Sequence, residues 1–233
     1  EVTVKYREAA LTTHTFSQAT ESAKSYALDA TVISANSAEE INSAIKQEVA
    51  DGKTAIRLNI ASDAGDNEFK AIREAFKNVK SGTIDLTLIG CKEIPADGLN
   101  DIKALKSIFL PDVTKIGMNA LSYCVNLQEI CAPNVSAIDE RAFAGFIMLT
   151  KVTLGELTDV RGEANSGGGI FDDDKRILID LYLPKNQEVM KGEFDENSNQ
   201  YIWKPTGESY FASLDYDNRI FLGYQFNSVK SWE

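Results

Sequence analysis

Leu105-Lys106-Ser107-Ile108-Phe109-Leu110-Pro111 returns 22 positions later as Leu127-Gln128-Glu129-Ile130-Cys131-Ala132-Pro133. The residues that follow also recur: Val113, Ile116, Ala120 and Leu121 return as Val135, Ile138, Ala142 and Phe143. A fixed period with apolar residues at fixed positions is the signature of a solenoid, because each repeat buries its apolar face only against its neighbours. The repeat therefore predicts an α/β fold, a right-handed solenoid with a parallel sheet.

The same period extends in both directions along the chain. Residues 83–104 form a degenerate repeat in which Leu86 and Leu88 take the positions of Ile108 and Leu110. A fourth repeat begins at Leu149 and carries a glycine-rich insertion before the strand pattern returns at residues 179–184. We therefore expect repeats over residues 83–184, with the insertion in a turn, where a solenoid tolerates it best.

The segments on either side of the repeats have different patterns. Residues 37–82 open with a capping box at Ser37 and Glu40 and then alternate helical and strand periods, which predicts a helical N-terminal cap. Residues 1–36 lack a sustained period and are interpreted as an N-terminal arm. Residues 185–233 contain short strand patterns at 201–203 and 219–226, so we expect a β-rich C-terminal cap over the last open apolar face.

Composition and charge exclude several classes of protein. The chain has 233 residues, 43% of them hydrophobic and 25% charged, which is ordinary for a globular protein. The net charge of -11 argues against nucleic acid, whose binding requires clustered Lys and Arg. No run approaches the roughly 20 apolar residues of a transmembrane helix. Because the chain begins with Glu1, we expect a start that has been processed or trimmed, so that any export signal or lipid anchor lies upstream.

The inventory of catalytic and metal-binding side chains is thin. The three cysteines, Cys91, Cys124 and Cys131, are odd in number and show no C-x-x-C spacing, so they fit neither a disulfide framework nor a zinc site. His14 is the single histidine and lies in the unpatterned arm. The sequence therefore predicts a protein that is not an enzyme and needs no metal or organic cofactor.

The repeat also resembles a known family. Leu-x-x-Ile-x-Leu-Pro, Val-x-x-Ile-Gly and Ala-Leu-x-x-Cys-x-Asn-Leu, spelled by residues 105–127, look like the BspA-like leucine-rich repeats of bacterial surface proteins. The family pattern has Phe where this chain has Leu99 and Leu121, and its Cys remains only at Cys124. The resemblance implies a leucine-rich-repeat solenoid, exported to the cell surface or periplasm, that functions in adhesion and binding. It transfers no binding residue.

Alternation along the strands predicts which side chains face away from the core. If Ile108 points inward, Ser107 and Phe109 point outward, and neighbouring strands align such residues in two rows. We expect one row to contain Arg57, Asp85, Ser107, Glu129, Lys151 and Asp180, and the other Asn59, Thr87, Phe109, Cys131, Thr153 and Tyr182. These rows would bind a protein or glycan ligand, with Phe109 and Tyr182 as anchors.

Three other interpretations stay open at this point. In the first, the outward face binds no partner and is either solvated or covered by the chain's own N-terminal arm. A second interpretation is a carbohydrate-active enzyme or accessory protein in which Asp85, Glu129 and Asp180 supply acid and base. This ranks lower, because an open sheet face excludes no water. The third is a structural spacer that holds another domain away from the surface.

Overall fold

A nine-stranded sheet runs through the computed structural model, which describes residues 30–164, 168–171, 176–214 and 219–232. Its strand order is β1-β2-β3-β5-β7-β9-β11-β15-β14, and every pairing is parallel except that of β14 with β15. The strands are β1 Val32–Ser34, β2 Ala55–Asn59, β3 Ile84–Ile89, β5 Leu105–Phe109, β7 Glu129–Ala132, β9 Lys151–Leu154, β11 Arg176–Leu183, β14 Ile220–Phe221 and β15 Tyr224–Ser231. The predicted continuous parallel sheet between Ile56 and Leu183 is confirmed.

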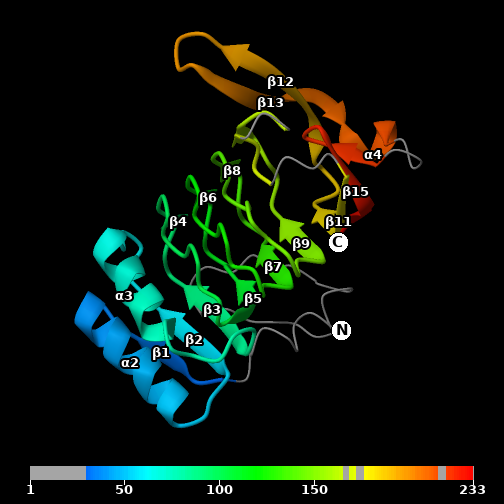
Figure 1. Ribbon diagram of the computed structural model, residues 1–233. Coiled ribbons are helices and arrows are strands. Elements are labelled where there is room, and N and C mark those ends of the chain that lie inside the picture. Colours follow the sequence, from blue (N-terminus) through cyan, green and yellow to red (C-terminus); the bar gives the residue numbers. More distant parts are fainter. Residues whose placement is uncertain (1–29, 165–167, 172–175, 215–218, 233) are drawn as a thin grey trace.

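A second, smaller sheet lies beside the first, in the order β12-β13-β10-β8-β6-β4. Its strands are β4 Glu93–Ile94, β6 Lys115–Ile116, β8 Ala137–Ile138, β10 Asp159–Arg161, β12 Glu188–Asp195 and β13 Gln200–Ser209. The short parallel strands recur with the repeat, so each repeat contributes one strand to each sheet. Figure 1 shows the two sets of strands stacked repeat upon repeat, with the β12–β13 hairpin projecting at the end beyond β8.

The helices are few. α2 covers Ala38–Ala50 and α3 covers Asp66–Phe76, and a single turn, α4, covers Tyr210–Ser213. The N-cap of α2 is confirmed, because the amide of Glu40 donates to the hydroxyl of Ser37. The Glu40 carboxylate reaches back one residue further than in a standard capping box and accepts from the amide of Asn36. Both long helices lie at the β1–β2 end of the main sheet in Figure 1.

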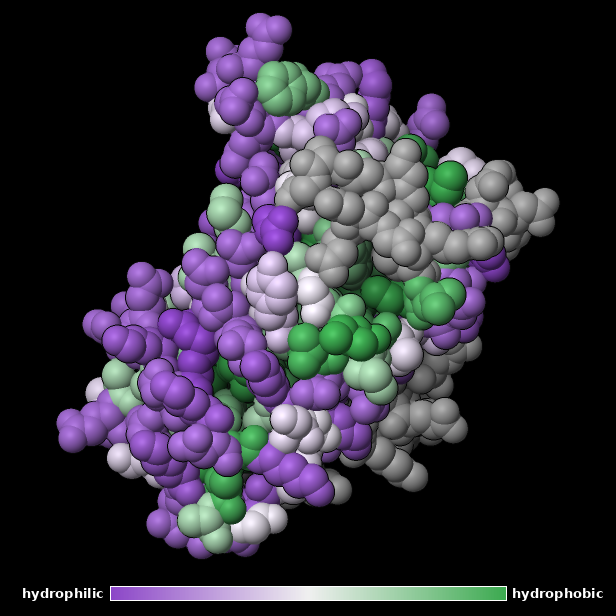
Figure 2. All heavy atoms as spheres, in the orientation of Figure 1, coloured by the Kyte–Doolittle hydropathy of each residue, from purple (hydrophilic) through white to green (hydrophobic). Residues whose placement is uncertain are grey.

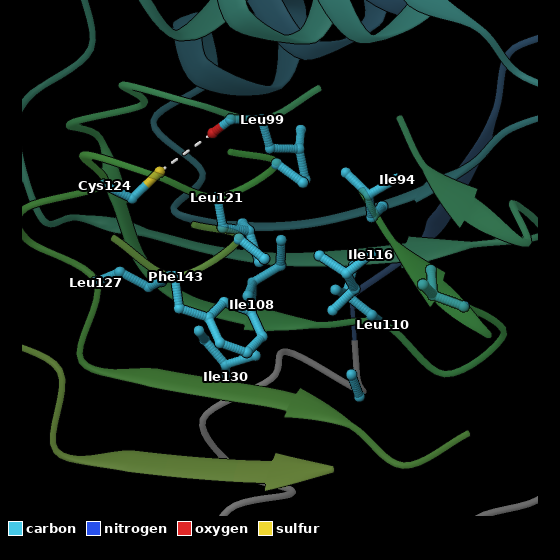
Figure 3. Close-up of a cluster of buried hydrophobic side chains, with 14 of the residues drawn as sticks. Ile94, Leu99, Ile108, Leu110, Ile116, Leu121, Cys124, Leu127, Ile130 and Phe143 are labelled. Carbon is cyan, nitrogen blue, oxygen red and sulfur yellow. Dashed lines mark hydrogen bonds between the residues drawn. The ribbon is translucent and has the colours of Figure 1, made fainter. Parts of the chain in front are cut away.

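Apolar side chains from both sheets and from the helices form one core. Ile108 and Ile130 from the main sheet, and Ile116 and Ile138 from the second, are all fully buried. Figure 3 shows the side chains of successive repeats packed against one another, and a hydrogen bond of 3.1 Å from the Cys124 thiol to the Leu99 carbonyl oxygen. Cys91 and Cys124 fill this core as reduced thiols, as expected for small apolar groups.

The backbone repeats as regularly as the side chains. Positive φ angles occur every 22 residues, at Asp97 (58°), Asn119 (54°) and Arg141 (55°). A second series contains Asp101 (54°) and Tyr123 (59°), and ends at Gly145 (76°). The left-handed region is unfavourable for most L-residues, so these positions bend the chain at a cost that the packed repeat offsets.

The C-terminal segment extends both sheets. β15, which lies in the segment expected to form a β-rich cap, adds a further parallel strand beside β11. The β12–β13 hairpin joins the second sheet through β10. At the other end of the main sheet, β1 pairs with β2, and β1 belongs to the segment interpreted as an arm. Most of that segment, including His14, lies outside the described residues.

Candidate binding face

The face of the main sheet opposite the core, called here the outer face, carries two rows of aligned side chains. Strand register defines both rows, and buried residues such as Ile108 and Ile130 alternate with them. The first row contains Asp85, Ser107, Glu129, Lys151, Asp180 and Ser228. The second row contains Arg57, Thr87, Phe109, Cys131, Thr153, Tyr182 and Lys230.

The expected position of Arg57 was wrong. The sequence placed it in the row of Asp85, but Arg57 pairs with Thr87, and Leu58 pairs with Leu88. The connection between β2 and β3 contains the full helix α3, so its length is independent of the repeat period. Arg57 therefore moves to the second row, and Asn59, which was expected there, pairs with Ile89 instead.

Side chains of the first row are linked to one another. The hydroxyl of Ser107 donates to the Asp85 carboxylate over 2.6 Å, and the Lys151 ammonium group lies 2.7 Å from the Glu129 carboxylate. Asp180 Oδ1 accepts hydrogen bonds of 2.7 Å from both Asn227 Nδ2 and Ser228 Oγ. The row is thus a largely half-buried line of polar and charged side chains, and contacts between neighbouring strands set its geometry.

An aromatic ring adjoins this line at the C-terminal end of the sheet. The ammonium groups of Lys151 and Lys230 lie 5.3 and 5.4 Å from the centroid of the Tyr182 ring, within the range of cation–π attraction. Lys230 also lies 3.9 Å from the Asp180 carboxylate. Tyr182 is therefore held in place by two cations that belong to neighbouring strands, as a positioned anchor would be.

Partial burial raises the pKa of Asp180, but hydrogen bonds from Ser228 and Asn227 outweigh it and hold the pKa below its usual value. The positive charges of Lys230 and Lys151 act in the same direction. The contacts of Asp180 therefore favour its ionised form. Asp85 and Glu129 are engaged by Ser107 and Lys151 as described above.

The centre of the outer face is buried, contrary to expectation. Phe109 was expected to be an exposed anchor, but its side chain is only 5% exposed, and its neighbour Thr87 is fully buried. Ser107 and Thr153 are buried too. The expectation relied on strand alternation, which separates the two faces of a sheet but does not reveal what lies over either one.

Three residues of this face were missed: Asn227, Ser228 and Lys230 of β15. The sequence analysis ended the last strand pattern at Phe226. In the structure the pairing of β11 with β15 shifts between Ile177 and Asp180, and the two-residue alternation that identified the other strands is interrupted there. The apolar Val229, which is buried, was the signal in the sequence for a longer strand.

Apolar side chains are also exposed outside the two rows. Ile147 and Met148 precede β9, and Leu178 precedes Asp180 in β11, with exposed fractions of 76%, 49% and 79%. Because Asp180 pairs with Lys151, these three residues lie near the N-terminal ends of the neighbouring strands β9 and β11. Figure 2 shows hydrophobic side chains gathered over the middle of a mostly hydrophilic face.

The described residues contain no group of three or more His, Cys, Asp and Glu side chains arranged to hold a metal ion. None of the described helices has both the length and the hydrophobicity needed to cross a bilayer.

The stacked repeats and the aligned outer face define a leucine-rich-repeat protein. Residues 67–167 match the model of the BspA type leucine rich repeat region in six copies, so this part of the chain carries BspA-type repeats. Proteins with such repeats are typically bacterial surface proteins. No curated protein and no solved structure matches the chain.

Proposed function

We propose that this chain is a non-enzymatic binding module of an exported bacterial surface protein, and that its outer face binds a protein ligand. In this proposal the repeats form a right-handed solenoid that is capped at both ends and presents the face. The observation that carries the proposal is the positioned group of Lys151, Tyr182 and Lys230 beside the charged first row. Tyr is typical of interface hot spots, and side chains that are already held in place lose little further entropy on binding.

Alternating charges favour a protein over a glycan as ligand. Glu129, Lys151 and Asp180 present negative, positive and negative groups in sequence along the first row. Complementary charges on a protein surface would fix the register of the complex and increase its association rate. Neutral glycans lack such groups.

Binding to purified extracellular-matrix proteins by surface plasmon resonance, and in parallel to a glycan array, tests the proposal. The triple variant Lys151→Ala/Tyr182→Ala/Lys230→Ala should weaken a protein interaction by about 30-fold or more, equivalent to roughly 2 kcal/mol. The control Lys115→Ala/Lys204→Ala removes the same two positive charges from the second sheet, where both lysines form ion pairs, and should retain binding.

Two outcomes contradict the proposal. Equal binding by the triple variant would move the site elsewhere, with the insertion at residues 162–174 and the exposed edge at Ile147 and Leu178 as the next surfaces to examine. Binding confined to the glycan array would replace the protein ligand with a carbohydrate.

A further inference from the structure

The second row is buried in its middle and half-exposed toward its ends. Thr87, Phe109, Cys131 and Thr153 lie side by side on β3, β5, β7 and β9, with exposed fractions of 0%, 5%, 7% and 7%. Tyr182, on the next strand of the row, is only half-buried. Burial is thus concentrated over the middle strands of the sheet.

Neighbouring strands alone do not account for the burial of Phe109. Strands stand about 4.8 Å apart and shield a side chain from the sides, while the direction away from the sheet stays open. Phe109 is flanked by Thr87 and Cys131, both smaller, so a phenyl ring on an uncovered sheet would rise above them. The helices and the second sheet bury their apolar side chains in the core, on the opposite side of the main sheet. Another segment must therefore contribute the cover.

The path of the chain indicates which segment this is. Arg57 Nη1 donates a hydrogen bond of 3.1 Å to the carbonyl oxygen of Ala30, and Arg57 belongs to the second row. The chain therefore reaches β1 from the side of the outer face. The 29 residues that precede Ala30 would span about 95 Å if extended, whereas β3 and β9 are separated by three strand spacings, about 14 Å.

The composition of these 29 residues also suits an apolar surface. Charges are nearly balanced, with four acidic and three basic residues, and apolar side chains are distributed along the segment. The apolar residues with large side chains are Val2, Val4, Tyr6, Leu11, Phe16, Tyr26 and Leu28.

We propose that residues 1–29 are an intramolecular occupant of the outer face, whose apolar side chains pack over Phe109 and its neighbours in the second row. The consequence for binding rests on the proposed function: an external ligand that uses the centre of this face must displace the segment. A face occupied 99% of the time by its own chain would show an apparent Kd about 100-fold higher than the uncovered face.

The thiol of Cys131 offers a test that needs no ligand. Cys131 lies between Phe109 and Thr153 in the second row, whereas Cys91 and Cys124 are fully buried in the core. Burial raises the pKa of both core thiols to about 12, so these two serve as unreactive references. Labelling of the native full-length protein with a thiol reagent at pH 8, followed by mass spectrometry of the peptides, measures each cysteine separately.

In the wild-type chain, we expect Cys131 to react about 100-fold more slowly than in the urea-unfolded chain. A full-length variant with Val2, Val4, Tyr6, Leu11 and Phe16 replaced by Ser should label Cys131 at least tenfold faster, while Cys91 and Cys124 stay protected. A control variant with Thr3, Thr12, Thr13, Thr15 and Thr20 replaced by Ser should match the wild type. If Cys131 is labelled at the same rate in the wild type and in the apolar-to-serine variant, whether that rate is fast or slow, the proposal is overturned. It is also overturned if the threonine-to-serine control accelerates labelling of Cys131 as much as the apolar-to-serine variant does.

Discussion

The side-chain amide of Gln187 binds both backbone groups of Leu157. Its Oε1 accepts from the Leu157 amide over 2.8 Å, and its Nε2 donates to the Leu157 carbonyl oxygen over 3.3 Å. Gln187 is completely buried, and its own carbonyl oxygen accepts from the amide of Tyr210. This one side chain ties the C-terminal segment to the fourth repeat.

Replacing Gln187 with Met should lower the free energy of unfolding by about 2–4 kcal/mol. The substitution keeps the volume but leaves the buried amide and carbonyl of Leu157 without partners, each at a cost of about 1–3 kcal/mol. Urea denaturation followed by circular dichroism measures the loss. The adjacent Asn186 is exposed, so Asn186→Ala serves as the control and should change stability by less than about 0.5 kcal/mol. A similar loss for both variants would show that the hydrogen bonds to Leu157 are not the cause.

Ile130→Asp should unfold the protein or nearly so. Ile130 is fully buried among the core residues of Figure 3, and an unpaired charge there costs several kcal/mol against a total stability of roughly 5–15 kcal/mol. The control Gln128→Asp places the same charge two positions away on an exposed side chain and should melt like the wild type. Near-wild-type thermal melting of Ile130→Asp would contradict the assignment of the core-facing side.

Much of the fold could be predicted because the same pattern of apolar positions occurs in several successive repeats. The positions equivalent to Ile108 are apolar in each repeat, and every one is buried in the same sheet. The two-residue strands of the second sheet were missed, although Ile116 and Ile138 were recognised as core positions, since strands this short have no alternation to detect.

The candidate site was less predictable, for three separate physical reasons. The register of β2, and with it the row of Arg57, depends on a helical connection that lies outside the period. Lys230 joins the site through a strand whose pairing contains a shift. The burial of Phe109 depends on what lies over the outer face, which the alternation of side chains along a strand does not encode.

Asn119→Val should destabilise the protein by about 1–2 kcal/mol, whereas Asn119→Gly should be neutral or slightly stabilising. Asn119 has a φ of 54°, in the left-handed region that glycine and asparagine tolerate and β-branched residues do not. Urea denaturation of both variants provides the measurement. Because either substitution removes the same amide side chain, equal losses would assign the effect to that side chain and not to backbone strain.

Asp180→Asn should lower stability at neutral pH by up to about 1 kcal/mol, because the carboxylate is a third exposed and its charge interactions are screened. Hydrogen bonds from Ser228 and Asn227 overcome the effect of partial burial and lower the pKa of Asp180 in the folded protein. A carboxyl with a lowered folded pKa contributes stability above its unfolded pKa of about 3.9 and loses it as the pH falls through the folded pKa.

The difference between the wild type and Asp180→Asn should therefore be largest near pH 7 and shrink steadily below about pH 4. Urea denaturation at a series of pH values from 2.5 to 7 measures this change directly. The exposed Asp63 provides a surface control, and Asp63→Asn should remain within about 0.5 kcal/mol of the wild type at pH 7. A stability difference for Asp180→Asn that stays constant down to pH 2.5 would show that shape, and not the charge held by Ser228 and Asn227, accounts for the contribution of Asp180.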